Sequence, residues 1–177
     1  AHSNLGSIYT QNGNFDLAKK EFQRSIELEP TLPLGYLNLG NYYASRGEFR
    51  QARAEFLRAR EQYITYKWGY PMPPELDLNL GRVNLKLKCF AVAEKYTQQY
   101  VQGVPDSLEG LLLLGNIYQQ EEKVELAKKA YLQVQGGGLA SAKAQNNLGL
   151  LYIQQNQYQK AHDAFNSSIN FYPQIPD

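Results

Sequence analysis

Apolar side chains recur along this chain at helical spacing, in pairs of short segments. Between residues 33 and 73, two segments each place apolar or small residues three or four positions apart, which is the period of one helical face. The first set is Tyr36, Leu39, Gly40 and Tyr43, and the second set is Phe49, Ala52, Phe56 and Ala59. Gly47 lies between the two sets, where a residue with positive φ costs little. The pattern predicts two helices joined by a tight turn.

This pattern is repeated five times. A Leu-Gly pair marks each copy, and its glycines are Gly6, Gly40, Gly81, Gly115 and Gly149, with spacings of 34, 41, 34 and 34 residues. An alanine follows each of these glycines twelve positions later. We expect the small glycine and alanine to let the two helix axes of a hairpin approach closely. Because one hairpin cannot bury its apolar faces alone, the repetition predicts a stack of hairpins.

The Leu-Gly pair, the alanine and the aromatic residues at fixed offsets resemble the tetratricopeptide repeat, a helix–turn–helix unit. The resemblance implies an all-α fold, a right-handed superhelical solenoid of about five hairpins. We expect a single array over residues 1–177, with repeats at about 1–32, 33–73, 74–107, 108–141 and 142–177. The first repeat lacks two residues and no polar capping helix follows the fifth. We therefore expect a fragment of a longer protein, with self-association through uncapped ends.

The composition argues against several classes of function. The chain has 18 Lys and Arg residues against 17 Asp and Glu residues, so the basic excess typical of nucleic-acid binding is absent. No apolar run approaches the ~20 residues of a membrane helix, so membrane insertion is not expected. The chain has one cysteine, Cys89, and two histidines, His2 and His162, and none of the common catalytic or metal-binding motifs. We expect a protein that is not an enzyme and that has no cofactor and no metal site.

The resemblance also implies where a partner would bind. In tetratricopeptide arrays the first helices of successive repeats line a concave groove, which holds a peptide or a helical segment of another protein. The groove residues predicted here are Asn4, Ser7, Asn38, Asn41, Asn79, Arg82, Asn116, Gln120 and Asn147. An asparagine amide both donates and accepts hydrogen bonds, so a column of asparagines can pair with a peptide backbone whatever its side chains are. Asparagine is also common at this position of the repeat, so the column is equally consistent with a repeat consensus that holds no peptide.

Seven additional residues lie in the second repeat, in the segment Glu61–Leu76. Aromatic residues gather there, and a second contact with a partner is predicted at Tyr66, Trp68 and Tyr70, because tyrosine and tryptophan are enriched at interaction hot spots. The alternative is a longer second helix whose aromatic side chains pack on the neighbouring hairpin.

Two other functions remain open. The array could be the non-catalytic, substrate-presenting domain of a larger enzyme such as a glycosyltransferase, whose superhelical domain it resembles in the asparagine column. It could also be a bacterial envelope assembly factor for pili or secretion. Binding of acidic chaperone tails is disfavoured, because the positions that would hold the terminal carboxylate are not basic; they are Ser3, Ser7, Glu75 and Asn79.

Overall fold

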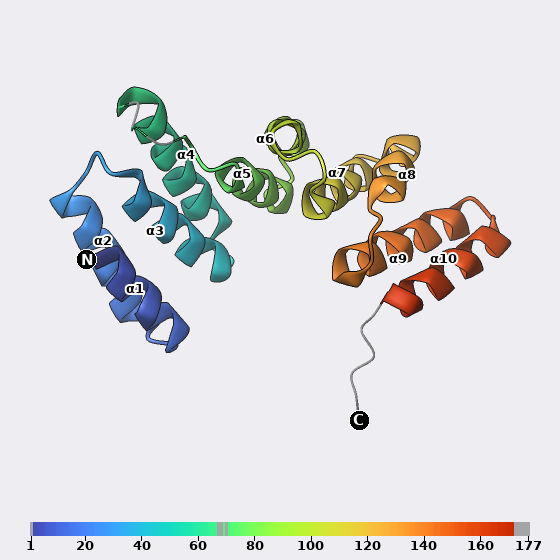
Figure 1. Cartoon of the computed structure of the whole chain (residues 1–177), viewed down its shortest axis with the longest axis horizontal. Helices are drawn as coiled ribbons and strands as arrows, with labels where there is room; N and C mark the ends of the chain where they lie inside the picture. Colours follow the sequence, from blue (N-terminus) through green and yellow to red (C-terminus); the bar gives the residue numbers. More distant parts are fainter. Residues whose placement is uncertain (1, 67–68, 70, 172–177) are drawn as a thin grey trace. The chain divides into compact units, whose positions relative to one another are not determined.

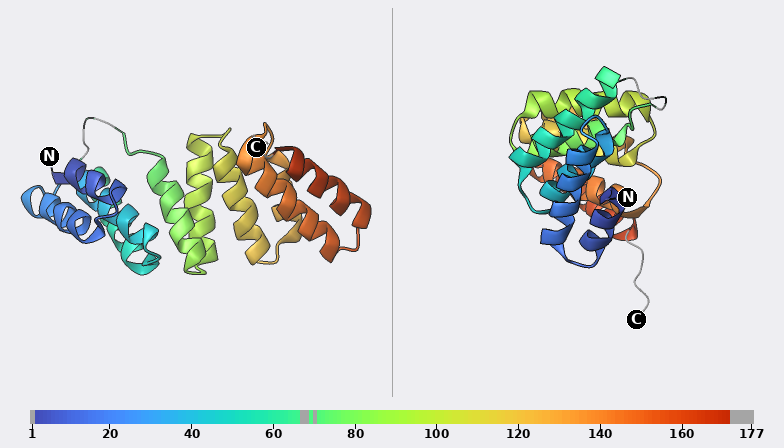
Figure 2. Two further views of the ribbon diagram at one scale, coloured as in Figure 1. Left: turned by 90° about the horizontal axis from the view of Figure 1, so that it is seen from below. Right: turned by 90° about the vertical axis from the view of Figure 1, so that its left-hand side faces the viewer.

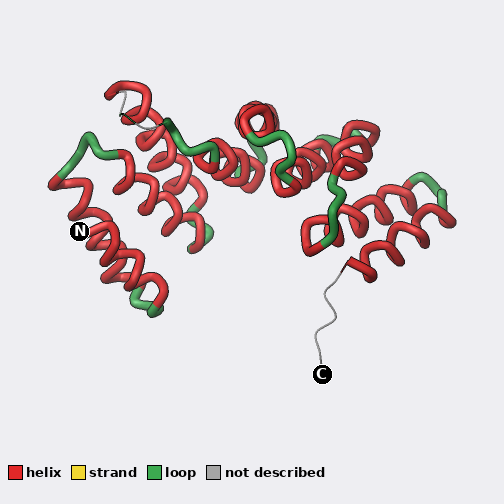
Figure 3. The backbone as a smooth tube through the Cα atoms, in the orientation of Figure 1, coloured by secondary structure: helices red, strands yellow, loops and turns green. Residues whose placement is uncertain are grey.

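A computed structural model describes residues 2–66, 69 and 71–171, and in these residues it contains helices and no strands (Figure 3). The helices are α1 (His2–Gln11), α2 (Phe15–Leu28), α3 (Pro33–Ser45), α4 (Phe49–Tyr66), α5 (Glu75–Lys86), α6 (Phe90–Gly103), α7 (Leu108–Gln120), α8 (Val124–Gln133), α9 (Gly138–Gln154) and α10 (Tyr158–Phe171).

The chain divides into two compact units. The N-terminal unit, Ala1–Cys89, contains α1 to α5, and the C-terminal unit, Phe90–Asp177, contains α6 to α10. In the N-terminal unit α1 pairs with α2 and α3 pairs with α4, and in the C-terminal unit α7 pairs with α8 and α9 pairs with α10. Figures 1 and 2 show the last of these pairs, in orange and red, as two helices lying side by side.

Each of these four hairpins is closed by an aromatic ring that lies on the repeat glycine. A Cβ atom on Gly6 would lie 2.5 Å from the Phe22 ring, and one on Gly40 would lie 2.6 Å from the Phe56 ring. Gly149 and Phe165 show the same contact, as do Gly115 and Tyr131. Glycine is required here because any side chain would collide with the ring. The predicted alanines are all buried; Ala93 lies on α6, and the four that lie in these hairpins are Ala18, Ala52, Ala127 and Ala161.

The turn after each first helix contains one residue in the left-handed conformation. These residues lie seven positions after the repeat glycine and have φ between 57° and 76°; they are Gly13, Gly47, Lys88, Glu122 and Asn156. The first two turns use glycine, which takes this conformation without steric cost, and the later three use residues with a side chain. The last three turns therefore have the same left-handed residue as the first two, although that residue is not glycine.

The second helix of the second repeat is longer than its counterparts. α4 has 18 residues, whereas α2 and α10 have 14 each. The additional residues of this repeat therefore lengthen the helix as far as Tyr66, whose side chain is exposed at its end.

The core of each unit is formed by the facing surfaces of successive hairpins. In the N-terminal unit one core cluster joins α2 to α3 through Ala18, Phe22, Leu39 and Tyr42. In the C-terminal unit a larger cluster joins α7, α8, α9 and α10; its most buried large members are Tyr131, Val134, Leu148 and Leu151. Phe22 and Tyr42 of the first cluster also line a hollow at the surface.

Candidate functional site

The N-terminal unit contains a hollow of about 360 Å³ between α1 and α3, which we call the N-terminal hollow. Its lining residues are Ser7, Thr10, Gln11, Phe22, Asn38, Asn41, Tyr42 and Ser45. Three of them, Ser7, Asn38 and Asn41, belong to the groove predicted from the sequence. None of the lining residues carries a charge.

The serine and threonine hydroxyl groups of this hollow bond to their own helices. Ser7 Oγ donates to the Ser3 carbonyl at 3.1 Å, and Thr10 Oγ1 donates to the Gly6 carbonyl at 3.0 Å. Such local bonds use the hydroxyl proton. The side-chain amides and the Tyr42 hydroxyl are therefore the groups that can donate hydrogen bonds into the hollow.

An asparagine pair connects α3 to α5 at the edge of this hollow. Asn79 Nδ2 donates to Asn41 Oδ1 at 3.2 Å. Each amide uses one end in this bond, so two groups are left over: the NH₂ group of Asn41, which donates, and the Oδ1 atom of Asn79, which accepts. The pair as a whole offers one donor end and one acceptor end.

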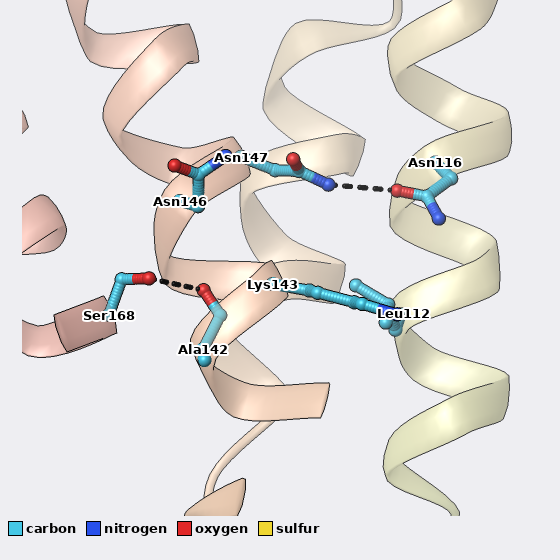
Figure 4. Close-up of a pocket in the computed structure, with 7 residues that line it drawn as sticks. All are labelled: Leu112, Asn116, Ala142, Lys143, Asn146, Asn147 and Ser168. Atoms are coloured by element: carbon cyan, nitrogen blue, oxygen red, sulfur yellow. Dashed lines mark hydrogen bonds between the residues drawn. The ribbon is translucent and has the colours of Figure 1, made fainter. Parts of the chain in front are cut away.

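The C-terminal unit repeats this arrangement between α7 and α9. Asn147 Nδ2 donates to Asn116 Oδ1 at 3.0 Å, and Figure 4 shows the two side chains reaching toward each other while the amide nitrogen of Asn116 points away from the bond. They border a hollow of about 360 Å³, which we call the C-terminal hollow. Its lining residues are Leu112, Asn116, Ala142, Lys143, Asn146, Asn147 and Ser168.

A buried tyrosine holds this second pair in place. Tyr131 is fully buried, and its Oη atom lies 2.8 Å from Asn116 Oδ1, 2.6 Å from Gln119 Oε1 and 3.2 Å from Asn147 Nδ2. The hydroxyl has one proton, so it donates to Asn116 or to Gln119 and accepts from Asn147. Burial raises the pKa of Tyr131 above its ordinary value, so this hydroxyl stays neutral. A neutral, buried anchor fixes the orientation of both amides.

The remaining predicted groove residues lie elsewhere. Asn4 is exposed on α1, Arg82 is half-buried on α5, and Gln120 is exposed at the end of α7. None of the three is among the lining residues of the N-terminal or the C-terminal hollow. Of the predicted second contact, Tyr66 is 52% exposed at the end of α4, and Trp68 and Tyr70 lie outside the described residues.

Sequence reasoning missed Tyr131, which orients the second asparagine pair, and several residues that line the C-terminal hollow. Tyr131 lies sixteen positions after its repeat glycine, where the other repeats have Phe22, Phe56, Thr97 and Phe165. Its hydroxyl, in place of a phenylalanine ring, was the feature of the sequence that could have indicated a polar role. Lys143 and Asn146 lie on α9, shortly before the predicted Asn147. Ser168 lies on α10, where its Oγ donates to the Ala142 carbonyl at 2.8 Å. Nothing in the repeat pattern distinguishes these three residues.

Over the part of the chain that the structure describes, no three His, Cys, Asp or Glu side chains gather where they could hold a metal ion. None of the helices in the described ranges combines the length and the apolarity that crossing a bilayer would require. Each asparagine pair can both donate and accept a hydrogen bond beside a hollow, which suits it to recognising another molecule.

Sequence models of one family match most of the chain. The family is described as Tetratricopeptide repeat, and its models match residues 1–32, 37–107, 108–136 and 142–175. No curated protein sequence matches the chain.

Solved structures with the same fold include several tetratricopeptide repeat proteins. MamA (residues 41 to the end) from Desulfovibrio magneticus RS-1 is 18% identical with a TM-score of 0.82, over 96% of this chain and 92% of that chain. YrrB, described as a TPR protein with an unusual peptide-binding site, is 21% identical with a TM-score of 0.77, over 98% of this chain and 86% of that chain. The Cut9–Hcn1 complex of the APC/C is 19% identical with a TM-score of 0.74, over 96% of this chain and 32% of that chain. These similarities confirm the predicted all-α solenoid fold class.

Proposed function

Because the chain belongs to the tetratricopeptide repeat family, we propose that it is a protein-interaction scaffold that binds an extended segment of a partner protein on the first helices of its hairpins. The two asparagine pairs carry this proposal. Each pair presents one free donor end and one free acceptor end beside a hollow.

A peptide group needs the complementary partners, a donor for its C=O group and an acceptor for its N–H group. An extended segment leaves both groups available on each residue, whereas a helix uses them in its own hydrogen bonds. The asparagine pairs therefore favour an extended segment over a helical one, and they read its backbone and not a particular side chain.

The hollows support the same interpretation. Each has a volume of about 360 Å³, which is at the lower end of ligand pockets and suits one or two side chains of a bound segment. YrrB, which shares the fold, is described as having a peptide-binding site. We propose that the backbone of the segment is held by the asparagine pairs while its side chains enter the hollows.

The test uses peptides selected from a displayed library of short random sequences with the wild-type chain. The variants Asn41→Asp and Asn116→Asp keep an oxygen acceptor for Asn79 and Asn147 but place a carboxylate where the free donor was. We expect each variant to bind the selected peptides about tenfold more weakly or worse, because a lost hydrogen bond and a new repulsion replace one favourable contact. Fluorescence anisotropy with labelled peptides measures the loss.

Asn170→Asp is the matched control, because Asn170 is exposed on α10 and the change adds the same charge. A second arm uses the selected peptide with its contacting N–H groups methylated, which should abolish binding if the backbone is read. Equal binding by the Asn41→Asp and Asn116→Asp variants, or a selection that enriches no peptide, would refute the proposal.

A further inference from the structure

The N-terminal hollow combines two nearly buried aromatic rings with neutral polar side chains. Phe22 and Tyr42 are 3% and 7% exposed, and both line the hollow. The other lining residues all carry a hydroxyl or a carboxamide group; they are Ser7, Thr10, Gln11, Asn38, Asn41 and Ser45. A side chain that enters this hollow therefore meets apolar surface together with uncharged hydrogen-bonding groups.

The Asn38 amide is free, unlike the amides of two other asparagines at the same position of the repeat. Asn79 and Asn147 also lie two residues before their repeat glycines, and each donates to an asparagine of the preceding first helix. In the first repeat the residue equivalent to those acceptors is Ser7, whose hydroxyl donates to its own helix. Within the ranges that the structure describes, no side chain forms a hydrogen bond with the Asn38 amide. Its NH₂ group and its Oδ1 atom are both available to a ligand.

The groups around Asn38 add further acceptors and a donor. Ser7, Thr10 and Ser45 each donate to a backbone carbonyl of their own helix, so toward a ligand their oxygen atoms act as acceptors. The NH₂ group of Asn41 remains a donor, because the bond with Asn79 uses the Oδ1 atom. The hollow thus offers donors and acceptors in the same space and carries no charge.

A carboxamide is the side-chain group that matches this set. It has two N–H donors and a C=O acceptor, whereas a carboxylate has no donor and an ammonium group has no acceptor. A charged group would also lose hydrating water in a hollow without an opposite charge, which costs free energy. An apolar side chain of similar size would leave the polar groups of the hollow without partners.

We propose that the N-terminal hollow selects the carboxamide of a glutamine or asparagine in the bound segment, and that Asn38 pairs with it. The inference rests on the proposed function, because it names the side chain that enters one of the two hollows. The Asn38 amide donates to the C=O group of the ligand side chain and accepts from its NH₂ group. The CH₂ groups of that side chain lie against Phe22 and Tyr42.

The first test uses the wild-type chain and a peptide enriched in the library selection. We expect a glutamine or asparagine at one position of that peptide. There the carboxamide is replaced by a carboxylate of the same shape (Gln→Glu or Asn→Asp) and by an apolar side chain of similar size (Gln→Met or Asn→Leu). Fluorescence anisotropy should show about tenfold weaker binding or worse for either replacement, because groups of the hollow lose their partners.

Asn38→Leu tests whether the N-terminal hollow is the source of this selectivity. The variant removes the amide and keeps the approximate size of the side chain. Its affinities for the carboxamide peptide and for the apolar replacement should therefore differ by less than about threefold. Asn170→Leu is the control, because Asn170 is exposed on α10, and it should keep the full preference for the carboxamide. Circular dichroism verifies that both variants are folded, and Asn38→Ala, which favours the helix, replaces Asn38→Leu if that variant does not fold.

The outcomes separate this inference from the proposed function. Peptides that bind the wild type and lose affinity with Asn116→Asp, yet show no preference for a carboxamide, overturn the inference and leave the proposed function in place. A carboxamide preference that survives the change at Asn38 also overturns it, because the selective group would then lie elsewhere. A selection that enriches no peptide overturns both.

Discussion

At the residue scale, the aromatic ring that packs on the repeat glycine explains why glycine is needed at this position. Phe56 is fully buried against Gly40, so its ring has no room to move away from an added side chain. A residue with a Cβ atom at position 40 would have to displace core atoms, which native cores resist because they are close-packed. The glycine is thus needed for its small size, even though glycine is a poor helix former.

We expect Gly40→Ala to lower the free energy of unfolding by roughly 1–3 kcal/mol, the usual cost of overpacking a core. The new Cβ atom would lie 2.6 Å from Phe56 Cδ1. Gly103→Ala on α6 is the control, because nothing lies within 4 Å of its added Cβ atom and alanine favours the helix by up to about 1 kcal/mol. Urea denaturation should therefore shift in opposite directions for the two variants, and equal shifts would contradict the packing argument.

At the element scale, a hairpin is held by a small residue on each helix. In the pair α7 and α8, Gly115 receives the Tyr131 ring and Ala127 is fully buried. Ala127 lies in the core cluster that also contains Leu148 and Leu151 of α9, so its size influences the packing of the next hairpin as well.

Ala127→Leu should reduce the free energy of unfolding by ~1–3 kcal/mol, because the three added carbon atoms would overpack a site that is fully buried in this cluster. Ala91→Leu on α6 makes the same change at an exposed position and should be nearly neutral. Thermal unfolding followed by circular dichroism compares them. An unchanged melting curve for Ala127→Leu would count against the pairing of these helices.

At the scale of the whole molecule, one buried carboxyl should influence how stability depends on pH. Asp77, at the start of α5, is 7% exposed, and its Oδ1 atom lies 3.5 Å from Arg60 Nε. Burial raises the pKa of Asp77, and the attraction of Arg60 opposes this effect without cancelling it. The folded chain therefore holds this proton more tightly than the unfolded chain does.

A carboxyl with a raised pKa contributes stability below its unfolded pKa of about 3.9, and this contribution is lost as pH rises through the folded pKa. We expect the wild type to lose stability relative to Asp77→Asn as the pH rises from acid towards neutral. Urea denaturation of both proteins across this range measures the difference. The opposite slope would mean that the attraction of Arg60 outweighs burial.

Much of the fold followed from the sequence, because the Leu-Gly pairs and the alanines repeat in phase. The division of residues 1–177 into five repeats stays a prediction. The hydrogen bond between Asn79 and Asn41 could not be foreseen, since it depends on how far one hairpin is rotated against the next. Periodicity places Tyr131 on a buried face but does not say that its hydroxyl reaches Asn116.

The two hollows differ in one respect that affects how the protein would behave in different solutions. The N-terminal hollow is lined by neutral side chains, whereas Lys143 borders the C-terminal hollow. Amide dipoles are not screened by dissolved ions in the way that a net charge is. The affinity of the first hollow for a bound segment should therefore change little between low and high salt concentration. Any preference of the second hollow for acidic residues should weaken as ionic strength increases.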